Sequence, residues 1–485
     1  MNLDLFLVQK VIQSLLKHEM NTALTPLDAP LSSSSSSLKS KQKMKENHGN
    51  ERVKLDAAIE EMEEMEEMEI EQEMEQVENK MKEKQNRRKL LEVYSMFYDK
   101  MNAANVYVNT QKNSGCFEYQ ETAVDIDSQI PRPKSFLKTY ITPEILQYIT
   151  NESKRILTFE CKIKGRLIRL HFIIFKNNPN GNDDLISHYK VLAHRVYMWL
   201  SMISDKSKCV ETLNIYVYLT PFEKKIPAAK GQCIGPENAN TGYTFRCEKQ
   251  NEIIIYRQEE WFKVLIHETM HAFGVDFDDS DDFEGRTKVD EYLKTLFTLP
   301  DDVNIKLSET YSEIWARIMN VVFQTYFKTP PSLESQTLYK FKKNIDFYLH
   351  LECVFSLYQC IKILDYMGIN YAVLTDNSES SKQMVTSFYR ENTNVFAYYV
   401  LTSILLNNYR DFLPWCANHN GAGLNIFKVK TTKSEFVNFI KSCYKKSDLL
   451  KEIVETERKV VRDYKKASTN RVLLKTMRMT IIGFD

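Results

Sequence analysis

Residues 253–274 read IIIYRQEEWFKVLIHETMHAFG and contain the pattern His267-Glu268-x-x-His271. If this segment is helical, both imidazoles lie on one face of the helix and the glutamate lies beside them. Apolar residues lead into the pattern, and Gly274 suits the position just after the last helical turn. The segment therefore predicts one buried helix that carries two metal-ligating histidines.

The residues before this helix predict a sheet. Two short runs of β-branched and aromatic residues, 242–245 and 253–256, are typical of strands that lead into the helix. A strand in this place can hold an extended peptide by β-augmentation. Gln258, Glu259 and Glu260 are expected in the first helical turn, where acidic side chains suit the positive end of the helix dipole.

A hydrolytic zinc site needs three protein ligands and one open position, so the two histidines need a partner. Glu309 and Glu313 share one face of a predicted helix that begins near Ser308 and continues with apolar residues. Glu309 could ligate the metal while Glu313 accepts the second ring N–H of a ligating histidine. Two carboxylates on an apolar helix are costly to bury without a cation, which favours this placement over a solvated helix end.

A shorter spacing leaves a second placement open. In the pattern HExxHxxGxxH the third ligand follows the second histidine by six residues, and Phe277 occupies that position here. Asp276 or Asp278 could replace it only by a shift of register. The acidic stretch 278–282 is expected to be a solvated loop rather than a calcium site. The sequence favours Glu309 without closing this alternative.

The HExxH pattern followed by Glu309-x-x-Ser312-Glu313 resembles the gluzincin zinc metallopeptidases, which carry HExxH and a downstream helix with Glu-x-x-Ser/Ala-Asp. Two features depart from that family: Glu313 stands where many members have Asp, and the interval before Glu309 is longer than in compact thermolysin-like members. The resemblance covers residues 242–322. The whole chain is also similar to proteins of large DNA viruses that are classed as metallopeptidases.

The resemblance implies an α+β fold with a zincin-like catalytic domain, and a zinc-dependent peptidase. His267, His271 and Glu309 would bind Zn²⁺, with Glu313 supporting a ligating histidine. Glu268 would take a proton from the zinc-bound water as that water attacks a peptide carbonyl, and would deliver it to the leaving amine. An endopeptidase is mildly preferred over an aminopeptidase, because the chain has no Gly-x-Met-x-Asn pattern.

Gluzincins take a donor for the developing oxyanion from a tyrosine or histidine on a later helix. Tyr398 and Tyr399 precede an apolar helical run, and only one can face the metal because neighbouring helical residues point about 100° apart. Packing in the core or at the rim is the alternative for both. His350 is a weaker candidate, since a histidine in the middle of a helix is more often a core residue with its own partners.

Composition and cysteine usage bound the class of protein. Lys plus Arg and Asp plus Glu both number 65, so no global attraction to nucleic acid or to a membrane is implied. The nine cysteines are scattered, odd in number and without a CxxC pair, which predicts reduced thiols. Together with the absence of a signal-like start or a transmembrane-length run, this predicts an intracellular, cytoplasmic and non-secreted protein. The viral resemblance would add the virus particle or the cytoplasm of an infected cell.

Three regions are expected along the chain. Residues 1–90 form a low-complexity extension, with a flexible linker over about 32–52 that begins with six serines. A Glu/Met-rich helix over 53–101 follows and is either solvated or the site of a protein partner. Residues 91–330 form the zincin-like αβ lobe, and residues 331–485 a mainly helical lobe. The basic tail 451–478 predicts a solvated amphipathic helix, with a nucleic-acid or partner contact as the alternative.

Within the αβ lobe, the pattern predicts a hairpin over 157–175, a helix over 187–204 and a strand over 213–219. A second class of function remains open, in which the protein is a structural or interaction protein on a zincin scaffold without activity. The presence of both histidines and of Glu268 favours a peptidase that acts on peptide or protein substrates.

Overall fold

The computed structural model describes residues 50–485 apart from 133–139, 177–181, 208, 278–282, 331–332, 421–431, 466–470 and 484–485. Most of the predicted linker over 32–52 lies outside the described residues, and residues 50–52 are helical instead. Contacts along the chain separate a unit that contains Gln13–Leu90 from a compact unit that contains Leu91–Asp485. The predicted αβ and helical regions both belong to this second unit.

One helix, α2 (Asn50–Thr110), covers the predicted 53–101 helix and continues beyond it. Its sequence changes at about residue 90 from Glu/Met-rich to amphipathic, and buried side chains then recur at helical spacing. Tyr94 donates a hydrogen bond to Asp346 (3.1 Å), and Tyr326 donates one to Asn102 (3.0 Å). The last five turns of α2 are therefore part of the folded unit.

The sheet has six strands in the order β1-β2-β3-β4-β6-β5. Their bounds are β1 (Tyr119–Ala123), β2 (Ser153–Ile163), β3 (Arg166–Phe175), β4 (Thr212–Tyr218), β5 (Gly242–Thr244) and β6 (Gln250–Ile255). β3, β4 and β6 are parallel, while β1, β2 and β5 run antiparallel to their neighbours. The predicted hairpin and strands are thus confirmed. The hairpin turns at Lys164 and Gly165, whose positive φ angles of 50° and 83° are those of a tight hairpin turn.

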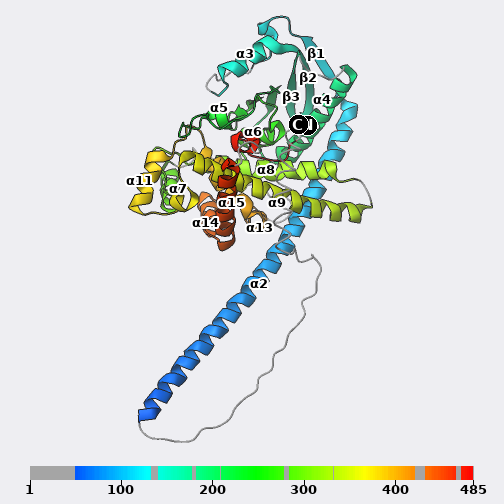
Figure 1. The fold of residues 1–485 in the computed structure, drawn as a ribbon. Helices are drawn as coiled ribbons and strands as arrows, with labels where there is room; N and C mark the ends of the chain where they lie inside the picture. Colours follow the sequence, from blue (N-terminus) through cyan, green and yellow to red (C-terminus); the bar gives the residue numbers. More distant parts are fainter. Residues whose placement is uncertain are drawn as a thin grey trace. The chain divides into compact units, whose positions relative to one another are not determined.

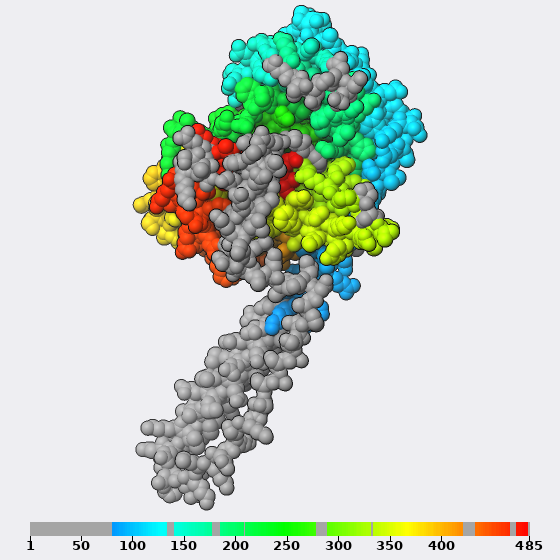
Figure 2. All heavy atoms as spheres, turned by 45° about the vertical axis from the view of Figure 1, so that its right-hand side comes forward, coloured from blue at the N-terminus to red at the C-terminus, as the bar shows by residue number. Residues whose placement is uncertain are grey.

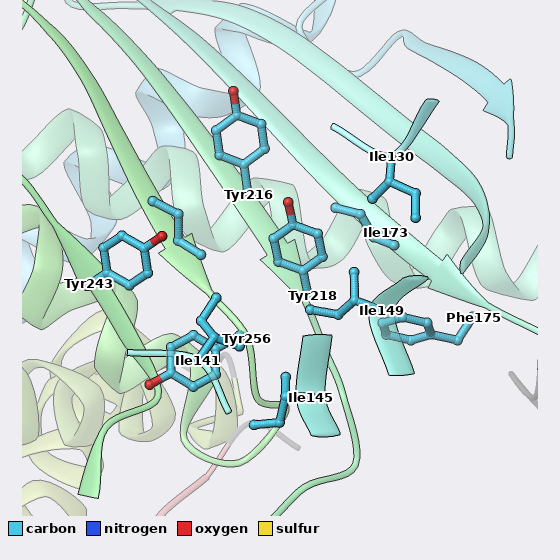
Figure 3. Close-up of a cluster of buried hydrophobic side chains, with 11 residues drawn as sticks. Ile130, Ile141, Ile145, Ile149, Ile173, Phe175, Tyr216, Tyr218, Tyr243 and Tyr256 are labelled. Atoms are coloured by element: carbon cyan, nitrogen blue, oxygen red, sulfur yellow. The ribbon is translucent and has the colours of Figure 1, made fainter. Parts of the chain in front are cut away.

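Helices cover both faces of this sheet (Figure 1). α4 (Asn182–Ile203) connects β3 to β4 and contacts one face, where the ring of Tyr189 lies 4.8 Å from that of Phe172. α3 (Pro143–Glu152) lies on the other face and buries Ile145 and Ile149. Figure 3 shows these isoleucines in a cluster with sheet residues such as Tyr218. The structure is therefore a mixed α/β fold with a covered sheet.

The HExxH helix, α6 (Trp261–Ala272), packs against β5, β6 and α8 (Leu307–Lys328). Gly242 on β5 is required for this approach, because a Cβ atom there would lie 2.7 Å from the Ile254 carbonyl oxygen and 2.9 Å from Val264. The edge strand β5 and the HExxH helix α6 are therefore in direct contact.

The described residues after 332 are mainly helical, as predicted. Among the described residues no helix is long and apolar enough to cross a membrane. In Figure 2 the cyan and green sheet region and the yellow to red helical region adjoin on one surface. The remaining elements are η1 (Gln111–Ser114), η2 (Asp127–Gln129), η3 (Ser204–Lys206), α5 (Pro236–Ala239), α7 (Phe283–Leu296), α9 (Glu334–Met367), α10 (Tyr371–Leu374), α11 (Glu379–Phe388), the π-helical turn η4 (Phe396–Leu401), α12 (Thr402–Asn407), α13 (Tyr409–His419), α14 (Lys433–Cys443), α15 (Ser447–Lys465) and α16 (Arg471–Lys475).

The end of the chain follows the prediction of a solvated amphipathic helix over 451–478 only in part. α15 is that helix, and most of its side chains are exposed. After α15 and α16, residues 476–482 are buried. Side chains from other elements hold their main chain: Asn320 donates to the Ile482 carbonyl (2.7 Å), and Gln359 donates to the Arg478 carbonyl (2.7 Å). We call residues 476–482 the C-terminal strap. The prediction of a solvated tail is wrong at residues 476–478, because side chains far away in sequence replace water as partners of the main chain of the strap.

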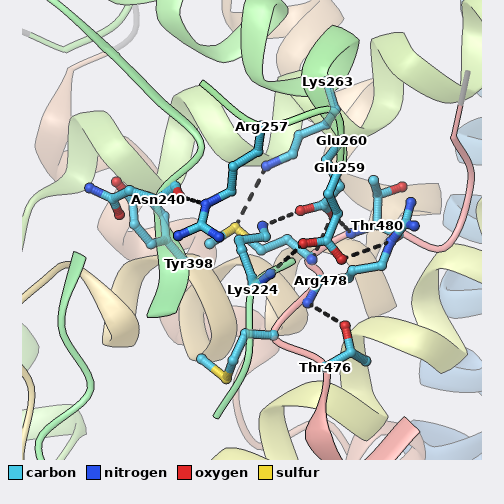
Figure 4. A network of polar contacts seen from close by, with 12 residues as sticks. Lys224, Asn240, Arg257, Glu259, Glu260, Lys263, Tyr398, Thr476, Arg478 and Thr480 are labelled. Atoms are coloured by element: carbon cyan, nitrogen blue, oxygen red, sulfur yellow. Dashed lines mark hydrogen bonds and ion pairs between the residues drawn. The ribbon is translucent and has the colours of Figure 1, made fainter. Parts of the chain in front are cut away.

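Glu260 does not serve the helix dipole as predicted. It precedes α6 in a left-handed conformation (φ 61°), and its Oε1 accepts the backbone N–H groups of Met479 (2.7 Å) and Thr480. Lys224 forms an ion pair with its other oxygen in the network of Figure 4. Although burial raises the pKa of Glu260, Lys224 and Lys263 outweigh it and lower the pKa to about 2. The Glu260 carboxylate thus joins the start of α6 to the C-terminal strap.

Glu352 should make stability depend on pH. Its Oε1 accepts the N–H groups of Ile481 (3.1 Å) and Ile482 (3.0 Å), and burial raises its pKa from 4.5 to about 7. Because the folded state holds this proton more tightly than the unfolded state, the contribution of Glu352 to the free energy of unfolding should be largest below pH 4.5. That contribution should fall by up to about 3 kcal/mol as the pH rises through 7. Urea unfolding at pH 5 and pH 8 measures this loss.

The variant Glu352→Gln keeps the acceptor oxygen and removes the titration. Its free energy of unfolding should therefore change less between pH 5 and pH 8 than that of the wild type. Glu379→Gln, at an exposed position of α11, is the control and should keep the wild-type dependence. Equal pH dependence in wild type and Glu352→Gln would contradict the assignment.

Candidate metal centre

Packing of α6 against α8 brings three ligand atoms together. His267 Nε2 lies 3.1 Å from His271 Nε2 and 3.1 Å from Glu309 Oε2, and His271 Nε2 lies 3.4 Å from the same oxygen. Of the His, Cys, Asp and Glu side chains described, these three form the group that could hold a metal ion. The sequence prediction of these three residues is therefore matched by their positions.

The alternative spacing is not supported. Phe277 is buried, with its ring 5.0 Å from that of Tyr311 and 5.2 Å from that of Phe436. A phenyl ring in this aromatic contact offers no ligand atom. Asp278 and the rest of the acidic stretch 278–282 lie outside the described residues.

Electrostatics indicate why a cation suits this cluster. Burial alone would lower the pKa of both imidazoles, but Glu309 together with Glu313 raises that of His267, and Glu309 together with Asp276 raises that of His271. Burial also raises the pKa of Glu309, and the histidines outweigh this effect and hold it well below its usual range. Two ring nitrogens and one carboxylate oxygen lie within 3.4 Å of one another, and each can accept a proton or bind a cation. A single cation could satisfy all three at once.

Glu313 lies beside His267, on the side of the ring away from the cluster. Its Oε2 is 3.1 Å from His267 Nδ1, within the distance of an ion pair, while Nδ1 makes no hydrogen bond of its own among the described residues. Lys263 donates to both Glu313 oxygens (3.0 and 2.9 Å), and Arg317 donates to Oε1 (2.8 Å). Burial raises the pKa of Glu313, but these two cations hold it well below its usual range. Sequence reasoning missed Lys263 and Arg317, although each lies one helical turn from a site residue in an apolar stretch.

Asp276 has the equivalent role for His271. Its Oδ2 lies 2.6 Å from His271 Nδ1, and Arg246 donates to its Oδ1 (2.5 Å). Asp276 is thus an orienting carboxylate and not a ligand. Gly274 makes this geometry possible, because its positive φ of 60° turns the chain back towards the helix end.

Four cysteines are paired, which contradicts the prediction of reduced thiols. Disulfides join Cys116 to Cys161 and Cys209 to Cys247. The second lies at the end of α6, where the N–H of Cys247 donates to the His271 carbonyl (3.3 Å). The prediction failed because both pairs join segments distant in sequence, which Cys spacing alone does not reveal. The other five cysteines are free: Cys233, Cys353, Cys360, Cys416 and Cys443.

Glu268 lies beneath the edge strand. A Cβ atom on Gly242 would be 3.6 Å from Glu268 Cγ, so the carboxylate chain contacts β5 closely. Burial raises the pKa of Glu268, and the neighbouring histidines oppose that rise without cancelling it. A carboxylate with a raised pKa is closer to the proton affinity that a general base needs near neutral pH.

The two tyrosines point to different places. Tyr398 donates to Glu309 Oε2 (2.8 Å), and its ring lies 5.9 Å from that of His267. Tyr399 donates instead to the Met477 carbonyl (2.6 Å), so its hydroxyl faces the C-terminal strap and not the candidate metal ligands. His350 is exposed on α9 and cannot serve a buried site. Burial, followed by Glu309, raises the pKa of Tyr398 well above its usual range, which keeps its hydroxyl a donor.

Comparison of the chain with protein-family models, curated proteins and solved structures finds no match. Any function therefore has to be argued from the residues of this chain.

Metal titration with Zn²⁺ as the probe tests the cluster. The wild type should bind one ion per chain, and Glu309→Ala should lose tight binding because a ligand is removed. Glu313→Gln and Asp276→Asn keep all three ligands and should weaken affinity about 10–100-fold, the usual loss for an orienting residue. Competition with a chelating dye measures these affinities. Wild-type affinity in Glu309→Ala would refute the ligand set.

Proposed function

We propose that the protein is a zinc-dependent peptidase of the gluzincin kind. The observation that carries the proposal is the convergence of Glu268, the three metal-ligating side chains and Tyr398. These residues come from α6, α8 and η4, which are far apart in sequence. The arrangement supplies a metal site, a base and a hydroxyl donor together, which are the groups that peptide hydrolysis requires.

The donor set fits Zn²⁺. Two imidazole nitrogens and one carboxylate oxygen, with each histidine supported by a carboxylate, are typical ligands of catalytic zinc. A bound zinc ion would acidify a water molecule and polarise the substrate carbonyl.

Glu268 is the proposed general base. It accepts a proton from the attacking water and then delivers that proton to the leaving amine nitrogen, so one carboxyl group serves both steps. Its raised pKa favours this exchange of roles. Glu268 contacts β5, which is the last strand in the order of the described sheet, and an extended peptide could pair with such an edge strand. An extended substrate without a required free amine suits an endopeptidase.

Tyr398 is the proposed oxyanion donor. Its hydroxyl is protonated and lies 2.8 Å from a ligand oxygen, within reach of charge that develops near the metal. Asn394 donates to the same hydroxyl oxygen (3.4 Å), which limits the directions in which the phenol can donate. A neutral donor near the metal would stabilise the negative charge that forms in the transition state, which supports this role for Tyr398.

The variant Glu268→Gln tests the enzyme against a non-catalytic scaffold. It should retain zinc, because Glu268 is not a ligand, and lose hydrolysis by at least about 10²-fold, because the base is removed. Cleavage of a peptide library derived from a whole proteome, read by mass spectrometry, measures activity without knowledge of the substrate. Wild-type protein that binds zinc and cleaves nothing would favour the scaffold. Equal cleavage by wild type and Glu268→Gln would exclude this mechanism.

Tyr398→Phe and Tyr399→Phe form a matched pair. Tyr398→Phe should lower kcat about 10²-fold with little change in KM, because a donor used in the transition state is lost. Tyr399→Phe removes the same atom from a buried hydroxyl that faces the C-terminal strap, so it should keep kcat and lose only stability. Steady-state kinetics on a peptide found in the library screen decide the matter. Equal kcat losses in the two variants would contradict the assignment of Tyr398.

A further inference from the structure

Arg317 connects the carboxylate beside His267 to the turn that carries Tyr398. It lies on α8, one turn after Glu313, with 1% of its surface exposed. Its three nitrogens donate to three elements: Nε to Glu313 Oε1 (2.8 Å), Nη1 to Ser356 Oγ on α9 (2.9 Å), and Nη2 to the Tyr398 carbonyl on η4 (3.0 Å). One guanidinium therefore contacts both the carboxylate behind His267 and the main chain of Tyr398.

Neutralising Glu313 does not by itself require Arg317. Lys263 already donates to both oxygens of that carboxylate from a buried position. A second buried cation is costly to desolvate, so its presence calls for a further contribution. That contribution is geometric, because a guanidinium is a rigid planar fork that fixes two acceptors relative to each other, whereas an ammonium is a point charge.

The second acceptor belongs to an unusual turn. Tyr398 lies in a π-helical turn, a form that is rare and frequent at functional sites. The turn has other side-chain support, since Thr402 donates to the Ala397 carbonyl (2.8 Å). Arg317 adds a fixed bond between this turn and α8, the helix that carries Glu309 and Glu313.

We propose that Arg317 is a positioning residue that sets His267, through Glu313, and Tyr398, through its carbonyl, in one common geometry. Metal affinity and the placement of the donor hydroxyl then depend on the same guanidinium. The effect on metal affinity holds for any metal centre here. Only the effect on turnover rests on the proposed function.

Zinc affinity tests this role without any assay of activity. Arg317→Met should lower affinity about 10–100-fold, as for other residues that orient a ligand. Arg317→Lys keeps a positive charge but cannot reach both acceptors, so it should show a smaller loss. Ser356→Ala is the matched control: it removes the third partner of Arg317 and leaves the other two, so affinity should stay within about twofold of wild type. Circular dichroism confirms that each variant is folded, and the Lys and Ala variants decide the matter if Arg317→Met is not.

A double-variant comparison isolates the contact to the tyrosine. Tyr398 donates to the ligand Glu309, so Tyr398→Phe should itself change zinc affinity. If Arg317 acts partly through Tyr398, the double variant with Arg317→Lys should lose less affinity than the product of the two single losses. Fully multiplicative losses, or an equal loss in Ser356→Ala and Arg317→Lys, would overturn the proposal. So would wild-type affinity in folded Arg317→Met.

Turnover separates this proposal from the proposed function. If the wild type cleaves peptides, Arg317→Lys should lower kcat about tenfold or more with KM unchanged, because a displaced donor acts only in the transition state. A wild type that cleaves no peptide would count against the peptidase, while the zinc affinities would still decide the role of Arg317.

Discussion

The structure depends on the burial of carboxylates around two histidines. Glu268, Glu309, Glu313 and Asp276 all lie within the site, and among the described side chains Lys263, Arg317 and Arg246 pair with Glu313 and Asp276. Buried carboxylates are unfavourable unless positive charge lies beside them. Without a metal, this charge comes partly from the histidines, because the carboxylates raise the pKa of both imidazoles. A cation bound by His267, His271 and Glu309 would take the place of those protons, which is why the packing of α6 against α8 suits a metal.

Buried carboxylates also join the end of the chain to the site. Glu260 and Glu352 are buried carboxylates whose partners are mainly backbone N–H groups of the C-terminal strap. Lys263 connects the two regions, since its Nζ contacts both Glu313 and the sulfur of Met479 (3.6 Å). Because the C-terminal strap donates backbone N–H groups to Glu260, it fixes the start of α6. The last residues of the chain are therefore part of the scaffold of the site, and their contacts span more than 200 positions of sequence.

The periodicity of the sequence predicted the elements that depend on local interactions. The HExxH helix, the hairpin and the i, i+4 pair Glu309 and Glu313 follow from periodicity, and the structure places them as expected. Features set by tertiary contact were missed: Asp276 as a partner of His271, the cations around Glu313, both disulfides and the burial of the strap. The choice between Tyr398 and Tyr399 could not be made either. It depends on the phase of a helix, and a π-helical turn alters that phase by its extra residue.

The two histidines are supported by different means. Glu313 is bonded to two cations that are themselves almost fully buried, so solvent hardly screens the support of His267. The support of His271 is weaker in charge, because Arg246, the partner of Asp276, keeps 28% of its side chain exposed. The Cys209–Cys247 disulfide lies beside this weaker support. Cys247, the residue after Arg246, donates its N–H to the His271 carbonyl (3.3 Å), and the disulfide joins it to Cys209 in a segment distant in sequence. The segment that carries Arg246 is therefore held both by a hydrogen bond to the end of α6 and by a covalent bond to another part of the fold.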